Sequence, residues 1–552
     1  MSEVKMKSKQ DKSKFLQVLM NDNISRREFL GWSAAIGTLA FMPGCGDSST
    51  HAPKNRPPNI LFILSDNQPA SMLGCYGNPE IRTPNIDRLA SEGVRFTQAF
   101  ACNGLCSPTR ASLMTGLIPS QHGIHDWIDD NTLTEMKEDW CAVREFRTLP
   151  LTLANRGYQT AMIGKYHMGN PHSPMPGFQY WITFPYGHTL DFWKDTIIDN
   201  GKEYELSGDE HIVEHFARRG VEYIRNYTHK KPFYLQLNFD APYLLPPTNL
   251  GPDKNRFYNY YVGMDFTKWW PREKFSQIFE DMIGGRQDDP NDEELHMLYM
   301  LKKMHLDRES MWNTASQNAV VDYGVGMVMD ALKKAGLDEN TLVIYSTDQA
   351  DFYGQHGLYG HTNYTIPSSL YDALLNVPLI MRQPGTVNSN MTSDLMIGQY
   401  DIFPTILDHL GFGNVTIENT PGHSFAPHLK GQSFDNWSNE VYFEQEESRG
   451  IRTSRYAYWK RLNDYFGPAQ LFDVVTDPGQ NKPLTLSEHK DIVDELDKKL
   501  NEFFNRYADP QYDLWKHGKT KSYTGRTKQV NDLFKTGWEW DKSDKPLFVD
   551  PV

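Results

Sequence analysis

The sequence CSPTRASLMTG, residues 106–116, combines a cysteine, a proline two positions later and an arginine four positions later. Proline is common in the first turn of a helix, so this segment is expected to begin one. Arg110 then lies one helical turn after Cys106, and the two side chains face the same site. Backbone N–H groups at a helix start favour a bound anion there. The alternative is purely structural, with Cys106 as a small buried hydrophobic residue.

The complete string, which ends in Leu-x-Thr-Gly, resembles the signature of the type I sulfatases, whose cysteine is oxidised enzymatically to formylglycine. The resemblance implies an alkaline phosphatase-like fold and a formylglycine at Cys106, made by a formylglycine-generating enzyme. The aldehyde hydrate of that residue has two hydroxyls on one carbon, so one can attack sulfur and the other can later expel sulfate. Arg110 would orient a hydroxyl of the hydrate and offset charge on the sulfate oxygens.

The composition is that of a large soluble protein. The chain has 552 residues, more than one ordinary domain, and 39% of them are hydrophobic. We expect an export signal and linker over residues 1–54, a catalytic domain over 55–435, and a C-terminal subdomain with a tail over 436–552. The formal net charge of −14 argues against nucleic acid as a partner and requires any sulfate site to be locally positive. Five cysteines are too few for a disulfide framework.

The first 50 residues have the pattern of an export signal. Five lysines come first, then the pair Arg26-Arg27, then an uncharged run over Leu30–Met42 that is too short to span a bilayer. This pattern resembles a bacterial twin-arginine signal, and the following Gly44-Cys45 resembles a lipoprotein cleavage site. We therefore expect an exported protein, periplasmic or anchored in the outer membrane by a lipid on Cys45. A frayed amphipathic helix is the alternative.

Two continuous apolar segments have the length of strands buried on both faces, and both end in polar residues. In an open α/β sheet such residues lie at the carboxyl ends of strands, where ligands bind. The expected fold class is α/β, with a large mixed central sheet sandwiched by helices and a smaller C-terminal α+β subdomain. The two segments are Ile60–Leu64, followed by Asp66 and Asn67, and Leu342–Thr347, followed by Asp348 and Gln349.

The resemblance implies that these four polar residues, with the formylglycine at Cys106, bind one calcium ion, Ca²⁺. Carboxylate and amide oxygens suit a hard cation. Asn67 stands where the family usually has a second acid, so two carboxylates face one divalent ion. The site is then nearly neutral before substrate arrives, and it should hold metal a little less firmly than a three-acid site. An Asp-Asn pair in a simple turn is the structural alternative.

The segment Ile163–Gly169 reads IGKYHMG and follows a short predicted strand. The related sulfatase stretch is Gly-Lys-Trp-His, in which the lysine binds a sulfate oxygen and the histidine is hydrogen-bonded to the hydrate. The resemblance carries these roles to Lys165 and His167, and alternate residues of an extended segment can reach one site. The alternative is an exposed lysine and a packed histidine.

Two positions depart from the family pattern. Tyr243 stands where a histidine is expected on the leaving-group side of sulfate, and His361 stands where a lysine is expected. Because a phenol has a pKa of about 10 and an imidazole about 6.5, imidazole is the better acid near neutral pH. We predict that His361 protonates the leaving group. The alternative is that His361 only binds a sulfate oxygen, as the lysine would, and that Tyr243 or water supplies the proton. His122 and His188 are further candidates for substrate binding, although histidines in a core are more common than functional ones.

These features predict an enzyme that hydrolyses sulfate esters on a sulfated carbohydrate. The prediction of a carbohydrate substrate depends on export, on the aromatic-rich segment 250–300, and on the fact that many exported bacterial members of the family act on polysaccharides. One alternative is a phosphonate or phosphate ester hydrolase, since related enzymes also carry formylglycine. Another is a sulfoglycan-binding protein that kept the site and lost turnover.

Overall fold

The computed structural model describes residues 56–549 except 190, 244–252, 267–270, 272 and 433–436. The predicted export signal, the linker up to residue 54 and Cys45 lie outside these residues. Among the residues that are described, no helix is both long enough and apolar enough to cross a membrane.

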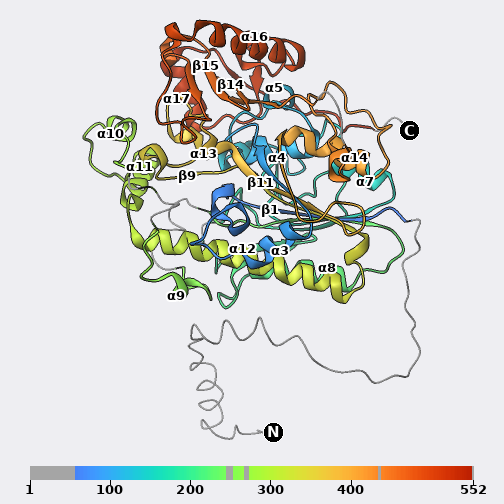
Figure 1. The fold of residues 1–552 in the computed structure, drawn as a ribbon. Helices are drawn as coiled ribbons and strands as arrows, with labels where there is room; N and C mark the ends of the chain where they lie inside the picture. Colours follow the sequence, from blue (N-terminus) through green and yellow to red (C-terminus); the bar gives the residue numbers. More distant parts are fainter. Residues whose placement is uncertain are drawn as a thin grey trace, which may run out of the picture. The chain divides into compact units, whose positions relative to one another are not determined.

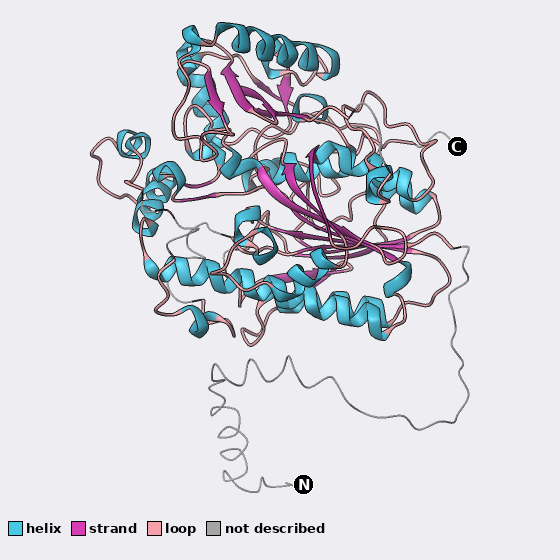
Figure 2. Ribbon diagram, in the orientation of Figure 1, coloured by secondary structure: helices cyan, strands magenta, loops and turns pink. Residues whose placement is uncertain are grey.

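A ten-stranded mixed sheet forms the centre of the molecule (Figure 2). The strand β1, Asn59–Ser65, pairs in parallel with β7 on one side and β8 on the other. All of its residues are buried, because helices cover both faces of the sheet. The order is β12 (Met391–Gly398), β2 (Val94–Phe100), β11 (Asn376–Arg382), β8 (Thr341–Thr347), β1, β7 (Phe233–Asn238), β3 (Gln159–Gly164), β4 (Tyr180–Thr183), β5 (Thr196–Asp199) and β6 (Lys202–Glu205).

Helices cover the two faces of this sheet in two layers (Figure 1). One layer holds α3 (Pro84–Ser91), α8 (Ile212–Arg225) and α12 (Arg308–Lys334), and the other holds α4 (Cys106–Thr115), α7 (Leu149–Asn155) and α14 (Ile402–His409). The predicted fold class, a mixed central sheet between helices, is confirmed. The shorter helices are α5 (Pro119–His122), α6 (Asp130–Glu135), α9 (Tyr258–Tyr261), α13 (Asp372–Leu375) and α15 (Ala426–Leu429).

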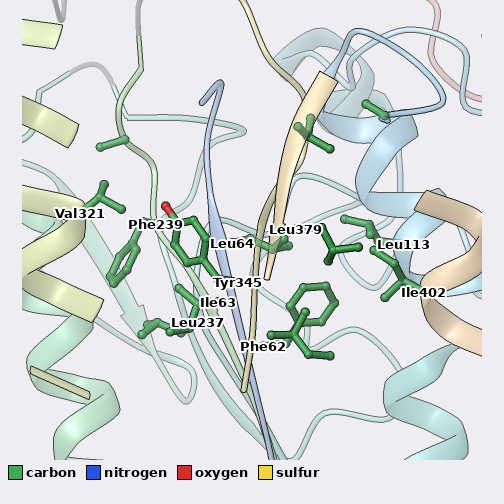
Figure 3. Close-up of a cluster of buried hydrophobic side chains, with 14 of the residues drawn as sticks. Phe62, Ile63, Leu64, Leu113, Leu237, Phe239, Val321, Tyr345, Leu379 and Ile402 are labelled. Carbon is green, nitrogen blue, oxygen red and sulfur yellow. The ribbon is translucent and has the colours of Figure 1, made fainter. Parts of the chain in front are cut away.

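The core is divided between the two faces of β1 (Figure 3). Successive side chains of a strand point to opposite faces. Ile63 accordingly lies on the side of Val321 from α12, whereas Phe62 lies toward Leu113 from α4 and Ile402 from α14. All five side chains are almost fully buried. Strand β1 is therefore fixed from both faces, and with it the polar residues at its carboxyl end.

The aromatic-rich segment 250–300, which shows no clear period, contains helices in its described part. These are α9, α10 (Gln277–Ile283) and the start of α11 (Glu293–Met304). The helix α10 begins at Ser276, whose hydroxyl accepts the N–H of Ile278, and ends at Gly284 with φ of 60°. A helix of two turns is too short to display a recognisable 3.6-residue period.

A second, antiparallel sheet follows the chain through its C-terminal part. It consists of β13 (Glu440–Gln445), β14 (Ser448–Thr453), β15 (Tyr456–Arg461) and β16 (Gln470–Asp473) in sequence order. The helix α16, Lys490–Tyr507, buries Leu496, Leu500 and Phe504, which recur every four residues on one side. The tail adds α17 (Gly525–Phe534) and a short pairing of β17 (Lys519–Thr520) with β18 (Glu539–Trp540). These elements lie within the predicted subdomain, and its boundary at 436 stays a prediction.

Candidate active site

Four neighbouring parallel strands bring polar side chains to one edge of the central sheet. Strands β8, β1, β7 and β3 run in the same direction, so their carboxyl ends meet at that edge. The helix α4 begins beside them with Cys106 in its first position. The residues that follow the strands are Asp348 and Gln349 after β8, Asp66 and Asn67 after β1, Asp240 after β7, and Lys165 after β3.

Cys106 lies at the centre of this group, with a side chain that is almost fully buried. Its Sγ is 3.3 Å from Gln349 Nε2, 3.6 Å from Lys165 Nζ and 3.9 Å from Asp66 Oδ1. Burial raises the pKa of this thiol well above 9, although Lys165 opposes the effect. The unmodified residue is therefore a neutral thiol, and a neutral thiol is a weak nucleophile.

Arg110 braces the site from α4. Its Nε and Nη2 donate to Asp348 Oδ2 at 2.9 and 2.7 Å, and Nη2 is 3.6 Å from Asp66 Oδ2. Its Nη1 donates to the backbone carbonyl of Lys165 at 3.0 Å. The guanidinium thus fixes two strand ends and contributes a permanent positive charge.

Three side chains have ligand atoms close enough for a single metal ion. Atoms of Asp66, Cys106 and Asp348 all lie within 4.8 Å of one another, and all three residues are buried. The Asn67 and Gln349 amides are hydrogen-bonded to each other at the border of this group. Burial raises the pKa of Asp66 to about 6, against the pull of Lys165. The carboxylate oxygens fit a hard divalent cation such as calcium, and Gln349 would add its oxygen once its terminal amide is turned over, because its Nε2 faces Cys106 in this structure.

Lys165 is fully buried and lies between two carboxylates. Its Nζ contacts Asp66 and lies 3.2 Å from Asp240 Oδ1. Although burial lowers the pKa of Lys165, Asp240 and Asp66 together hold it above its usual range. Asp240 was missed by the sequence analysis, although its place two residues after a buried strand was a usable signal.

His167 lies beside the loop that carries Trp127, and its ring centroid is 6.5 Å from that of His188. Its Nε2 lies 3.0 Å from the carbonyl of Ile128, so Nε2 carries the proton and donates it. Its Nδ1 is buried and has no hydrogen-bond partner among the described residues. Burial, and Lys165 after it, lower the pKa of His167 well below 6.5. The imidazole is therefore neutral, and Nδ1 is able to accept a proton.

A row of aromatic and imidazole rings borders Lys165. The ring centroid of Tyr243 lies 4.9 Å from Lys165 Nζ. His188 stacks on Tyr243 with centroids 5.3 Å apart, and His361 meets Tyr243 edge-on at 6.2 Å. Tyr364 then stacks on His361 at 5.8 Å. The structure thus brings three predicted substrate-binding residues together, whereas the participation of Tyr364 could not be predicted from its sequence context.

His361 is oriented by a buried carboxylate. Its Nδ1 lies 2.5 Å from Asp351 Oδ1, and the His361 side chain is only 7% exposed. This contact occupies Nδ1 and leaves Nε2 as the nitrogen available to a substrate. Burial raises the pKa of Asp351 to about 6, and His361 opposes that rise. Asp351, three residues after Asp348, was also missed by the sequence analysis.

The structure does not bring His122 to this group. Its Nε2 lies 3.1 Å from the hydroxyl of Ser112 on α4, and its Nδ1 accepts the N–H of Ile124 at 3.2 Å. Both ring nitrogens are therefore used inside the fold, and the suggested role in substrate binding is replaced by a structural one.

The C-terminal tail packs beneath the loop that carries Trp127. The hydroxyl of Ser522 accepts the backbone N–H of Asp126 at 2.9 Å. Arg526 donates to the hydroxyl of Ser368 at 2.6 Å, and Ser368 lies four residues after Tyr364 of the ring row. The tail therefore supports two loops beside the site, a role its sequence did not reveal.

Comparisons with known proteins show the family of this chain. The family model described as Sulfatase matches residues 58–412, and the model described as N-sulphoglucosamine sulphohydrolase, C-terminal, matches residues 354–506. An N-acetylglucosamine-6-O-sulfatase from Bacteroides thetaiotaomicron is 25% identical over 521 residues, covering 82% of this chain and 87% of the relative.

Two solved structures share the fold. One was determined in complex with its substrate D-glucosamine-2-N,6-O-disulfate; its TM-score is 0.61 at 23% identity, and the match covers 82% of this chain and 98% of that one. The other is the phosphonate monoester hydrolase of Agrobacterium radiobacter, with a TM-score of 0.62 at 20% identity, covering 82% of this chain and 96% of that one.

Proposed function

The chain belongs to the sulfatase family and is a sulfuric ester hydrolase, and from this premise we propose that it removes sulfate from a carbohydrate through a formylglycine at Cys106 and a calcium ion. The observation that carries the proposal is the position of Cys106. It starts α4 within 4 Å of a carboxylate, an ammonium and an amide from three strand ends. The N-terminus of α4, which is suited to binding an anion, therefore lies at the position of the nucleophile, Cys106.

Modification of Cys106 would supply a nucleophile that the unmodified thiol does not provide. The thiol is neutral in this environment because burial raises its pKa well above 9. Formylglycine would supply a hydrate with two hydroxyls, which permits attack on sulfur and the later release of sulfate as separate steps. A formylglycine-generating enzyme is therefore a proposed partner during maturation.

Asp66, Asp348, Asn67 and Gln349 would hold the calcium ion together with the modified Cys106. When bound, this ion supplies positive charge to the sulfate oxygens. The chain adds two fixed charges of its own, Lys165 and Arg110, whose contacts place them against the same carboxylates. Together they make the site locally positive in a protein of net charge −14.

The two histidines suit opposite proton transfers. Nδ1 of His167 is an unprotonated acceptor, which is suited to taking a proton from the hydrate when sulfate leaves. Asp351 holds Nδ1 of His361, so Nε2 of His361 would deliver the leaving-group proton on the other side. Tyr243, whose pKa burial raises well above 10, is a poor acid, and its ring instead lies against Lys165.

The carbohydrate class is supported by the relatives and by the ring row. The match to an N-acetylglucosamine-6-O-sulfatase extends over 82% of the chain. The ring of Tyr364, which is partly exposed, is suited to the apolar face of a sugar ring. We further propose that residues 1–54 direct export, to the periplasm or to a lipid anchor at Cys45.

The two alternatives make different predictions in one assay. The phosphonate monoester hydrolase shares the fold, so the fold alone does not separate the two ester classes. We propose to incubate the mature enzyme with a panel of sulfated oligosaccharides, an aryl sulfate and an aryl phosphonate ester, and to measure free sulfate by ion chromatography, released aryl alcohol by absorbance, and saccharide binding by calorimetry. Sulfate release, absent in a Cys106→Ala variant, supports the proposal. Faster hydrolysis of the phosphonate refutes it, and saccharide binding without turnover would identify a binding protein.

A further inference from the structure

Asp240 is a fourth buried carboxylate in the site, beside Asp66, Asp348 and Asp351, and the mechanism above assigns it no role. It lies two residues after the end of β7 and is completely buried. Its Oδ2 accepts the backbone N–H of Thr189 at 2.6 Å, next to the half-buried His188. Its Oδ1 faces Lys165 Nζ at 3.2 Å and has no hydrogen bond in the described structure.

The position of Asp240 differs from that of the proposed metal ligands. Ligand atoms of Asp66, Cys106 and Asp348 converge within 4.8 Å, whereas Asp240 is not part of that group. Its partner is instead the ammonium of Lys165, which the proposed function places on a sulfate oxygen. Asp240 therefore changes the net charge around the bound substrate, and it does so through Lys165, the residue that contacts substrate.

The charges of the described site can be compared directly. Apart from the Asp351–His361 pair, Arg110 and Lys165 supply two positive charges, and three carboxylates oppose them, Asp66, Asp348 and Asp240. A divalent cation brings this set to a net charge of about +1. A sulfate ester carries one negative charge, whereas a phosphate monoester above pH 7 carries nearly two, because its second pKa is about 6.

We propose that Asp240 is a specificity-determining residue that matches the site to ester groups with a single negative charge, and so favours sulfate over phosphate monoesters. Without Asp240 the site has a net charge of about +2, which suits a dianion. This inference rests on the proposed sulfatase chemistry at Cys106 and assigns the selection among anions to one side chain.

The alternative role for Asp240 is structural. Its Oδ2 fixes the loop of Thr189, and loss of that contact would misplace His188 and lower activity on every substrate equally. The substitution Asp240→Asn separates the two roles, because the asparagine oxygen can still accept the Thr189 N–H while the charge is gone.

The experiment compares a sulfate and a phosphate monoester with the same nitrophenyl leaving group at pH 8. For an anion about 6 to 8 Å from the lost charge at an effective dielectric of about 20, one unit charge corresponds to roughly a thirty- to hundredfold change. We expect Asp240→Asn to shift the kcat/KM ratio toward the phosphate ester by at least about tenfold. Asp240→Glu, which keeps the charge, should leave the ratio near that of the wild type.

A matched control is Asp513→Asn, which removes a buried carboxylate paired with Arg449 at 2.7 Å in the C-terminal part. Its ratio should equal that of the wild type. Should Asp240→Asn fail to fold, Asp240→Ser removes the same charge with a smaller side chain and is judged by the same ratio.

A second readout does not depend on turnover. Calorimetry with methyl sulfate, a monoanion, and methyl phosphate, mainly a dianion at pH 8, on Cys106→Ala protein with and without calcium, should show that Asp240→Asn strengthens methyl phosphate binding more than methyl sulfate binding. An unchanged ratio, or equal losses on both esters, overturns the proposal for Asp240 while leaving the sulfatase function intact. A wild-type enzyme that hydrolyses only phosphate or phosphonate esters refutes the proposed function instead.

Discussion

Removing the imidazole of His361 should affect substrates according to how much their leaving group needs a proton. A sugar alkoxide is a very poor leaving group and requires an acid, whereas nitrophenolate leaves without one. The structure gives this imidazole one free nitrogen, because Asp351 holds Nδ1 at 2.5 Å and the side chain is 7% exposed. Nε2 is therefore the atom whose loss matters.

The expected size follows from this geometry. A positioned acid typically contributes about 10² to 10⁴ in rate, which is about 2.7 to 5.4 kcal/mol of barrier. His361→Ala should lose this full factor on a sugar sulfate and about tenfold or less on nitrophenyl sulfate. Asp351→Asn keeps a partner for Nδ1 but removes its charge, so it should fall between the wild type and His361→Ala on the sugar and change little on the aryl ester.

The assay measures kcat and KM for both substrates with wild type and variants at equal formylglycine content, which mass spectrometry verifies. Ser112→Ala, which removes a hydroxyl bound to His122 away from the site, serves as the control. Equal losses on the sugar and aryl sulfates would refute the acid role and leave His361 as a residue that only binds substrate.

Three further predictions follow from the buried charges. Calcium affinity, measured by calorimetry, should be retained above about pH 6 and lost as the pH falls through that value. The reason is that burial raises the pKa of Asp66 to about 6, and a protonated carboxyl binds calcium poorly. An affinity that does not depend on pH would contradict this. Asp348→Ala should abolish both calcium binding and activity, and chelation of the wild type should inactivate it reversibly; full activity after exhaustive chelation would exclude the metal site. Arg526→Ala should lower the free energy of unfolding, measured by denaturant titration, by about 3 kcal/mol. The reason is that the substitution leaves the buried Glu447 carboxylate, 3.0 Å away, without its ion-pair partner. A loss below about 0.5 kcal/mol would show that the tail contributes little to stability.

The sequence predicted the strands that carry the site because their signals are local. Ile60–Leu64 and Leu342–Tyr345 are unbroken apolar runs, and both lie in central strands followed by polar residues. The helix start at Cys106 was equally local, since Pro108 marks a first turn. These three elements account for the sheet edge at which Cys106 meets Asp66.

The missed residues are those whose role depends on distant partners. Asp240 is a single acid after β7 and Asp351 a second acid after β8, and only the folded chain places them on Lys165 and His361. His122 is the opposite case. Its place after the signature motif suggested a functional role, whereas in the fold its Nε2 is hydrogen-bonded to the hydroxyl of Ser112. Local sequence predicts an element and its chemistry, whereas pairing across the sheet edge is a tertiary property.

The central claim is that a modified Cys106 hydrolyses carbohydrate sulfate esters. The most direct measurement is free sulfate released from a sulfated oligosaccharide by enzyme expressed with a formylglycine-generating enzyme, with the state of Cys106 determined on the same sample by peptide mass spectrometry. We predict that the rate of sulfate release is proportional to the fraction of Cys106 converted to the aldehyde. Equal activity in protein whose Cys106 is entirely unmodified would contradict the account.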